Sequence, residues 1–347
     1  MSTTDDHTAG GSEETTSNKK ECTSCEQKNI DNITEGINCS VAILDNDVSM
    51  CACCGKEGNS EDMNACNKCK MVKYCNAACK KKHRTKHKKA CERRVAELHD
   101  EKLFKQPPPK EDCPICFLRL PTLLTGSRYY SCCGKVLCSG CAHAPVYDNE
   151  GNIVAEMICP FCRTPHHTSE EENVERLKLR MDAGDPEAIY GLGVFYREGV
   201  SGIIQDHNKA LELFHRSAEL GYSKAYIMIG ISYDIGVKVG HGIEIDKEKA
   251  LHYYELAAMR GDETARHNLG IDEEKVGNWE RALKHFVIAS KGGDSISLNK
   301  IKQMYTKGHA TKDDYTKALQ SYQTYLGEIK SRQRDDAAAF TDEYRYY

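Results

Sequence analysis

Sixteen residues that can ligate a metal ion lie in closely spaced pairs between residues 51 and 162. In a Cys-x2-Cys knuckle the chain turns so that both sulfurs reach one ion, at about 2.3 Å for zinc. Pairs separated by three residues do the same on one helical face, where positions four apart are neighbours. Because each zinc takes four ligands, we predict about four ions per chain. The predicted ligands are Cys51, Cys54, Cys66, Cys69, Cys75, Cys79, His87, Cys91, Cys113, Cys116, Cys132, Cys133, Cys138, Cys141, Cys159 and Cys162.

A disulfide scaffold is the other chemistry that paired cysteines can perform. The chain has 347 residues and 19 cysteines, and its first 20 residues are polar. It contains no apolar run of about eighteen residues, so we expect no secretion signal and no membrane span. In the reducing cytoplasm or nucleus, clustered cysteines bind metal more often than they pair. We therefore predict an intracellular protein, cytoplasmic, nuclear or both.

The first run of ligands resembles the MYND finger over residues 51–91, through the sequence Tyr74-Cys75-Asn76-Ala77-Ala78-Cys79 followed by His87 and Cys91. The resemblance implies that the ligand pairs interleave. One ion would be held by Cys51, Cys54, Cys75 and Cys79, and the other by Cys66, Cys69, His87 and Cys91. His83 lies on the same helical face and competes as a ligand, although we prefer His87. Arg84 stands where the family usually has Trp, which alters the peptide-binding groove that the family implies.

A basic run, Lys80–Lys89, lies within the first module. Such runs bind nucleic acid or nuclear-import factors, or they form a solvated helix face that offsets thiolate charge at zinc. No aromatic residues alternate with these cations to stack on bases. We therefore expect the second role, and proteins or peptides rather than nucleic acid as partners.

The second run resembles a RING finger over residues 113–163, a cross-braced two-zinc fold that often docks ubiquitin-conjugating enzymes. Lys135 stands where the family usually has a histidine ligand, and the doubled Cys132-Cys133 restores the count to eight. The resemblance implies two all-cysteine sites. One would use Cys113, Cys116, Cys138 and Cys141, and the other Cys132, Cys133, Cys159 and Cys162.

Three residues match positions that ligase RING fingers use to contact the conjugating enzyme and ubiquitin: Ile115, Pro160 and Arg163. Each also has a structural interpretation: Ile115 packs in the small core of the module, Pro160 fixes the turn of its knuckle, and Arg163 neutralises thiolate charge. Two hypotheses follow. Either this is a RING-type ubiquitin ligase whose other parts recruit substrate, or it is a non-catalytic scaffold. A MYND-bearing lysine methyltransferase is excluded, because helical repeats occupy the place of its β-rich catalytic domain.

These modules are followed by a repeating helical pattern. Lys209-Ala210-Leu211 recurs as Lys249-Ala250-Leu251, Arg281-Ala282-Leu283 and Lys317-Ala318-Leu319, each opening an apolar stripe of helical period. Upstream of three of these stripes lies a partner helix with small residues at fixed positions. The pattern predicts an all-α solenoid of about four helical pairs, led by a helix over residues 170–183. It resembles the Sel-one-like repeat family, which implies a concave face for protein partners. We expect the third unit to lack a full first helix and loop.

The predicted fold is therefore multidomain, with two small zinc modules followed by a solenoid. Residues 1–50 form a disordered polar tail, in which Cys22, Cys25 and Cys39 are spare thiols. Residues 92–112 are a helical extension and a proline-rich linker. The repeats occupy residues 170–335, and residues 336–347 form a C-terminal tail.

Overall fold

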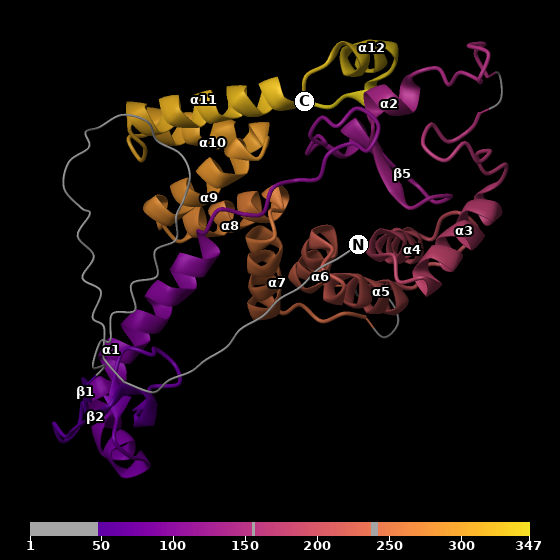
Figure 1. Ribbon diagram of the computed structural model, residues 1–347. Helices are drawn as coiled ribbons and strands as arrows, with labels where there is room; N and C mark the ends of the chain where they lie inside the picture. The colour runs from indigo at the N-terminus through magenta and orange to yellow at the C-terminus, as the bar shows by residue number, and fades with distance from the viewer. Residues whose placement is uncertain (1–47, 155–156, 237–241) are drawn as a thin grey trace, which may run out of the picture.

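The structure is a computed structural model, and it describes residues 48–154, 157–236 and 242–347. The predicted tail up to residue 47, with Cys22, Cys25 and Cys39, lies outside these residues. Val48–Met50, which the prediction placed in that tail, form strand β1. Most of the described chain is helical (Figure 1). None of the described helices combines the length and the apolar character needed to cross a membrane.

The first module (residues 51–91, with β1 before it) is built from two small antiparallel ladders and one long helix. Strand β1 pairs with β2 (Glu57–Asn59), and β3 (Asn64–Ala65) pairs with β4 (Lys73–Tyr74). Helix α1 (Ala77–Leu103) starts where the Asn76 side chain accepts a hydrogen bond from the Cys79 N–H at 2.8 Å. His87, Cys91 and the predicted extension therefore lie on one continuous helix, which ends before the Pro107–Pro109 spacer. Cys75 precedes the N-cap, so the Cys75–Cys79 pair spans the start of α1 and not one helical face as predicted.

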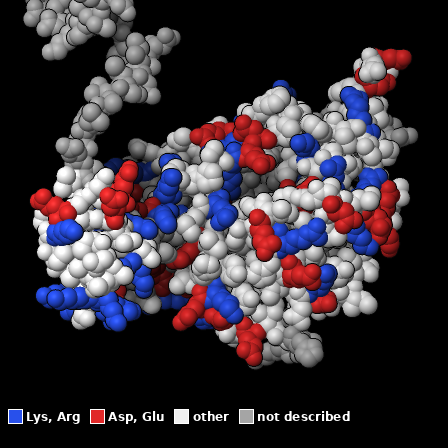
Figure 2. Space-filling view, turned by 60° about the horizontal axis from the view of Figure 1, so that its bottom comes forward, with Lys and Arg blue, Asp and Glu red and all other residues white. Residues whose placement is uncertain are grey.

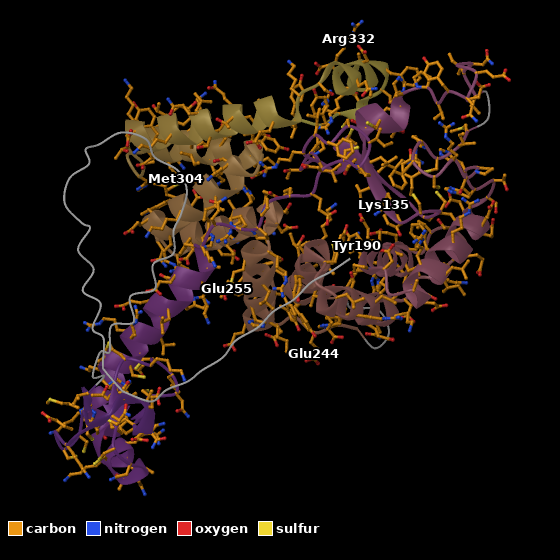
Figure 3. All side chains as sticks on the ribbon, in the orientation of Figure 1. Lys135, Tyr190, Glu244, Glu255, Met304 and Arg332 are labelled. Carbon is orange, nitrogen blue, oxygen red and sulfur yellow. The ribbon has the colours of Figure 1, made fainter. Side chains whose placement is uncertain are left out.

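The C-terminal end of α1 is fixed to the repeats by one buried arginine and by two more exposed pairs of charged or titratable side chains. Arg266 is 1% exposed and donates a hydrogen bond to the Leu103 carbonyl, one of the unpaired carbonyls of the last helical turn. His99 Nε2 lies 3.0 Å from Glu255 Oε2, and Figure 3 labels Glu255 beside α1. Asp100 pairs with Arg281. The first module consequently stands on an arm, at the lower left of Figure 1.

The second module (residues 113–163) is a hairpin with a short helix. Strands β5 (Ser127–Tyr130) and β6 (Lys135–Cys138) pair in the register Ser127↔Cys138 to Tyr130↔Lys135. This register puts Cys132 and Cys133 in the hairpin turn and Cys138 at the end of β6. Helix α2 (Ser139–His143) follows at once, and η2 (Leu124–Gly126) is a single 3-10 turn that precedes β5.

Within the described residues, four helical pairs follow a leading helix, as predicted. The leading helix is α3 (Glu170–Asp182), and the pairs are α4 (Pro186–Glu198) with α5 (His207–Glu219), α6 (Ser223–Ile235) with α7 (Lys247–Met259), α8 (Glu263–Lys275) with α9 (Trp279–Lys291), and α10 (Ser295–Thr306) with α11 (Lys312–Ile329). The prediction for the third unit was wrong. Its first helix, α8, has 13 residues like α4 and α6, and only the connection to α9 is short.

Each of the first three pairs packs through one glycine. A Cβ atom at Gly193 would meet the Phe214 ring at 2.7 Å, and one at Gly230 or Gly270 would meet Tyr254 or Phe286 at 2.6 Å. The missing side chain lets an aromatic ring of the second helix lie against the backbone of the first. This explains why small and aromatic residues recur at fixed positions in the sequence.

The repeats form an arc from α3 to α11, and the second module lies between its two ends (Figure 1). On one side Tyr129 Oη donates to Asp185 at 2.7 Å, and Arg180 Nη2 donates to the Cys132 carbonyl at 2.8 Å. On the other side the Thr122 N–H donates to Tyr325 Oη at 2.8 Å. The module thus bridges the first and last repeat units.

The prediction that residues 336–347 form a C-terminal tail is wrong. Helix α12 (Arg332–Phe340) and the 3-10 turn η3 (Asp342–Tyr344) pack on the second module, α12 against α2. The Tyr346 side chain is completely buried, and Tyr346 Oη donates to Asp335. The sequence from residue 336 is polar enough to suggest a solvated end, but Ala337 and Tyr346 are buried, as is Arg334 just before it, which the prediction placed at the end of the repeats. The segment is therefore structural.

Candidate metal centres

The predicted ligands come together in four groups of four, each with ligand atoms within 4.8 Å of one another. The groups have the composition that the two resemblances implied. Group one is Cys51, Cys54, Cys75 and Cys79; group two is Cys66, Cys69, His87 and Cys91; group three is Cys113, Cys116, Cys138 and Cys141; group four is Cys132, Cys133, Cys159 and Cys162.

The spacing within the groups suits a tetrahedral ion. Zinc–sulfur bonds of about 2.3 Å place neighbouring sulfurs about 3.8 Å apart in a tetrahedron. The Sγ–Sγ distances are 3.7 Å from Cys54 to Cys75, 3.7 Å from Cys116 to Cys138, and 3.8 Å from Cys133 to Cys159. A disulfide needs about 2.05 Å, and the cysteines in the described part of the chain are free thiols.

Four of the five Cys-x2-Cys pairs in these groups share one backbone device. The residue after the second cysteine has a left-handed conformation, and its N–H donates to the carbonyl of the first cysteine at 2.8–3.0 Å. These residues are Gly55, Lys70, Phe117 and Arg163. Three of the four carry side chains, for which this conformation costs about 1–2 kcal/mol. The tight turn that brings two sulfurs to one point therefore requires this strained position.

The hairpin turn of the second module uses the same device without a leading cysteine. Gly134 has φ +68° and donates to the Tyr130 carbonyl at 2.8 Å. Cys133 thus stands where a knuckle places its second cysteine, and Cys132 supplies the other sulfur. This geometry explains how adjacent cysteines replace the usual pair, and why Lys135 is not needed as a ligand. Lys135 belongs to none of the four groups.

Thiol electrostatics in group three favour a bound cation. Hydrogen bonds from the Cys138 and Cys141 thiols, the largest effect, lower the pKa of Cys113. The same network, led by the bond to Cys113, raises the pKa of Cys141 far above its ordinary value. One thiol therefore ionises easily at the expense of its neighbours. A divalent cation replaces these shared protons and lets all four sulfurs carry charge.

Arg334 supplies independent support for a charged group three. Its side chain is fully buried, its Nη1 donates to the Arg119 carbonyl at 2.8 Å, and its Nη2 lies 3.8 Å from Cys116 Sγ. It forms no ion pair with a carboxylate of the described residues. A buried guanidinium needs negative charge nearby, and four thiolates with one zinc carry a charge of about −2. Sequence reasoning missed this residue, because nothing local connects it to a cysteine 218 positions away.

His87 rather than His83 joins group two. His87 Nε2 lies 3.3 Å from Cys69 Sγ, and its side chain is 7% exposed. His83 instead faces Tyr74, with Nδ1 3.3 Å from the phenol oxygen, and its ring stacks on that of His87 at 5.9 Å. Arg84 is exposed on α1. Cys53, a further thiol, belongs to none of the four groups.

The residues predicted to contact a conjugating enzyme lie on the two outer knuckles of the second module. Ile115 is 37% exposed, and Pro160 is half-buried. Arg163 is exposed, but its Nη1 donates to the Tyr147 carbonyl at 2.7 Å. The structure adds two exposed rings that sequence reasoning missed: Phe117 at 77% and Phe161 at 42% exposure. Apolar side chains of both knuckles therefore face solvent.

Comparison with family models identifies two parts of the chain. Residues 51–91 match the MYND finger. Residues 186–222 and 223–262 each match the Sel1 repeat. MYND fingers and Sel1 repeats are protein-interaction modules, and the MYND finger binds zinc. The four groups of candidate ligands are consistent with zinc in both modules.

Among curated proteins, the chain is similar to an ERAD-associated E3 ubiquitin-protein ligase component, HRD3B of Arabidopsis thaliana, at 29% identity over 103 residues, covering 29% of this chain and 15% of that protein. It is also similar to the E3 ubiquitin-protein ligase DA2 of Arabidopsis thaliana, at 38% identity over 65 residues, covering 19% of this chain and 14% of that protein. The chain thus spans only a small part of these relatives.

Among solved structures, the chain is similar to a Sel1 repeat protein from Oxalobacter formigenes, with 26% identity and a TM-score of 0.38, covering 49% of this chain and 64% of that one. It is also similar to a protective antigen of uropathogenic Escherichia coli, with 25% identity and a TM-score of 0.37, covering 50% of this chain and 40% of that one.

Proposed function

We propose that this protein is a RING-type ubiquitin ligase, in which the second module recruits a charged conjugating enzyme while the first module and the repeats hold the substrate. The exposed apolar side chains on both outer knuckles carry the proposal. Ile115 is 37% exposed and Phe161 is 42% exposed, and neither belongs to the buried core of the module. Exposed apolar groups of this kind mark protein-binding surfaces.

Such a ligase performs no covalent chemistry of its own. It binds the conjugating enzyme and orients the thioester held there toward a substrate lysine, so its contribution is positioning. Zinc here is structural: it holds Ile115 and Phe161 in place through the knuckles that contain them. We propose four ions per chain, one for each group. The names of the two relatives are consistent with this role.

A non-catalytic scaffold is the second candidate, and the contacts of the second module favour it. Its helix α2 has only five residues, and α12 packs against it. Arg163 is also engaged with the Tyr147 carbonyl. In this alternative the second module serves only to join the two ends of the arc.

An autoubiquitination assay with a panel of conjugating enzymes separates the two candidates. We expect chain formation with at least one enzyme, and we expect Ile115→Ala or Pro160→Ala to abolish it while zinc content stays unchanged. Ile204→Ala makes the same kind of change at a residue 87% exposed in the repeats, and it should have no effect. Absence of chains across the whole panel would leave the scaffold as the function.

A further inference from the structure

A groove runs along one face of α1, beside group two of the first module. It encloses about 700 Å³, and the residues that α1 contributes recur at helical spacing from Ala77 to Glu92. A second hollow shares Lys68, Cys91 and Glu92 with it and continues along the helix past Val95. Because they share these three lining residues, the two hollows adjoin each other along α1, and together we call them the α1 groove.

Cations dominate the rim of the α1 groove. Lys68, Lys80, Lys81, Arg84 and Lys88 line it. Glu92 is the one acidic residue that lines the first hollow, and the second hollow adds Asp100, which is paired with Arg281. Three thiolates, a neutral histidine and one zinc would give group two a charge of about −1. The five cations therefore exceed what Glu92 and the metal site neutralise by three charges. Lys and Arg side chains gather on the first module, at the left of Figure 2.

Several of these cations are available to a partner. Lys81, Arg84 and Lys68 form no ion pair with the described residues, and Lys80 is bound only to the neutral amide of Asn67 at 2.9 Å. The floor between them is largely apolar, with exposed Ala77 and, further along, Val95 at 38% exposure. A ligand for this groove needs negative charges at its edges and apolar groups between them.

We propose that the α1 groove binds an acidic peptide segment of a partner protein, in which carboxylates flank apolar side chains. This rests on the proposed role of the first module in holding substrate, and it specifies the chemistry of that partner. The helix rises about 1.5 Å per residue, so the face from Ala77 to Glu92 is about 24 Å long. An extended peptide of about seven residues spans that length.

Nucleic acid shares the negative charge but fits the groove less well. Single strands gain affinity by stacking bases on exposed rings. The aromatic ring of the groove, Tyr74, is 1% exposed, and His87 is 7% exposed and belongs to group two. The cations therefore have no stacking surface beside them, whereas the apolar floor suits side chains such as leucine.

The test measures fluorescence anisotropy of a labelled peptide of about ten residues, glutamates flanking leucines, with the purified full-length, zinc-loaded protein. We expect saturable binding that weakens as salt increases, and no binding of a peptide with lysines in place of the glutamates. The double variant Lys81→Glu with Arg84→Glu should weaken binding at least tenfold. Lys86→Glu with Lys89→Glu changes the net charge equally on residues of α1 outside the groove, and should change affinity less than twofold.

Zinc content of every variant shows that the first module is intact. Equal losses in both double variants would mean that overall charge attracts the peptide, which overturns the proposal. Tighter binding of a single-stranded oligonucleotide of similar length would also overturn it. So would a large gain in affinity when residues 1–47 are deleted, because the chain's own acidic N-terminal segment would then be the occupant. No ubiquitin enzymes are present, so these results do not depend on ligase activity.

Discussion

At the residue scale, the metal centres depend on contacts that differ in how far they reach along the chain. Knuckle pairs and helical pairs are local, and their spacing predicted the ligands, whereas the two family resemblances implied how these ligands divide into four groups. The choice between His83 and His87 was not settled by spacing, because both lie on one helical face. Packing separates them: the Tyr74 phenol faces His83, which leaves His87 to Cys69.

We predict that His87→Ala lowers the zinc content of the purified protein by one ion per chain, because group two loses a ligand. His83→Ala should leave the content unchanged, since that ring lies outside the four groups. Metal analysis after gel filtration measures both. Loss of zinc from the His83 variant alone would reverse the assignment.

Arg334 shows why the rest of the site could not be predicted. Besides the nearby Ile329 carbonyl, its partners are Cys116 and the Leu118 and Arg119 carbonyls, more than 210 positions earlier in the sequence. A single arginine in a polar stretch has the sequence properties of a solvated residue. Only the folded chain shows that it lies beside the sulfur of Cys116, and that the residues after it, which the prediction treated as a tail, pack on the second module.

At the element scale, α12 acts as part of the second module. A Cβ atom at Gly140 of α2 would meet the Arg334 backbone N at 2.8 Å, so the two helices touch directly. The His143 ring lies 4.8 Å from Phe340 and 5.6 Å from Tyr344. Helix α2 is too short to form a core of its own, and the C-terminal segment supplies the missing apolar surface.

We predict that Arg334→Leu destabilises the second module by about 3 kcal/mol, because it leaves buried thiolate charge unpaired and removes the arginine donor from the Arg119 and Ile329 carbonyls. Zinc should also leave this module faster when a colorimetric chelator is added. Arg332→Leu is the matched control, since Arg332 is on the same helix with its side chain 96% exposed. Equal release rates from the two variants would contradict a role for Arg334.

The junction between α1 and the repeats contains a second buried titratable side chain besides Arg266, namely that of His285. Burial, with a smaller effect of Arg266 and Arg281, lowers the pKa of His285 to about 3, while Asp100 opposes this. Its ring lies 4.8 Å from Phe104. An unfolded chain binds a proton here below about pH 6.5, whereas the folded chain does not until about pH 3. The contribution of His285 to the free energy of unfolding is therefore fully present above about pH 6.5 and is lost as the pH falls toward 3.

We predict that His285 alone lowers the free energy of unfolding of the repeats by about 2 kcal/mol between pH 7 and pH 5. His285→Gln should remove this part of the pH dependence, and His252→Gln, at an exposed position of α7, should retain it. Denaturant unfolding followed by circular dichroism at both pH values measures the difference. Acid release of zinc affects all variants alike, so parallel pH profiles for the wild type and His285→Gln would contradict the prediction.

At the scale of the whole molecule, the sequence predicted the parts better than their arrangement. Helical period and small residues predicted the number of pairs, because each unit packs mainly on its neighbours. The resemblance implied an open concave face, but the chain's own linker and second module occupy much of the space between the ends of the arc. Lys110 of the linker pairs with Glu263 at 2.7 Å, for example. Such contacts join distant segments and leave no periodic signal.

The second module closes the arc, so its zinc should control the distance between the first and last repeats. Tyr129 and Arg180 tie it to the α3–α4 end, and Thr122 and Arg334 tie it to the α11–α12 end. These contacts exist only while groups three and four hold the module folded. The helical pairs have their own buried cores, so the repeats should remain helical when the module unfolds.

We therefore predict that zinc chelation separates the ends of the arc with little loss of helix. Energy transfer between dyes on unnatural amino acids at Leu179 and Lys317, both exposed, should fall on chelation while circular dichroism changes little. His87→Ala provides the control, because it removes an ion only from the first module, which stands on the α1 arm outside the arc, and should leave the transfer unchanged. Unaltered transfer after complete zinc removal would show that the repeats hold their curvature alone. A parallel collapse of helicity would show instead that they cannot fold without the second module.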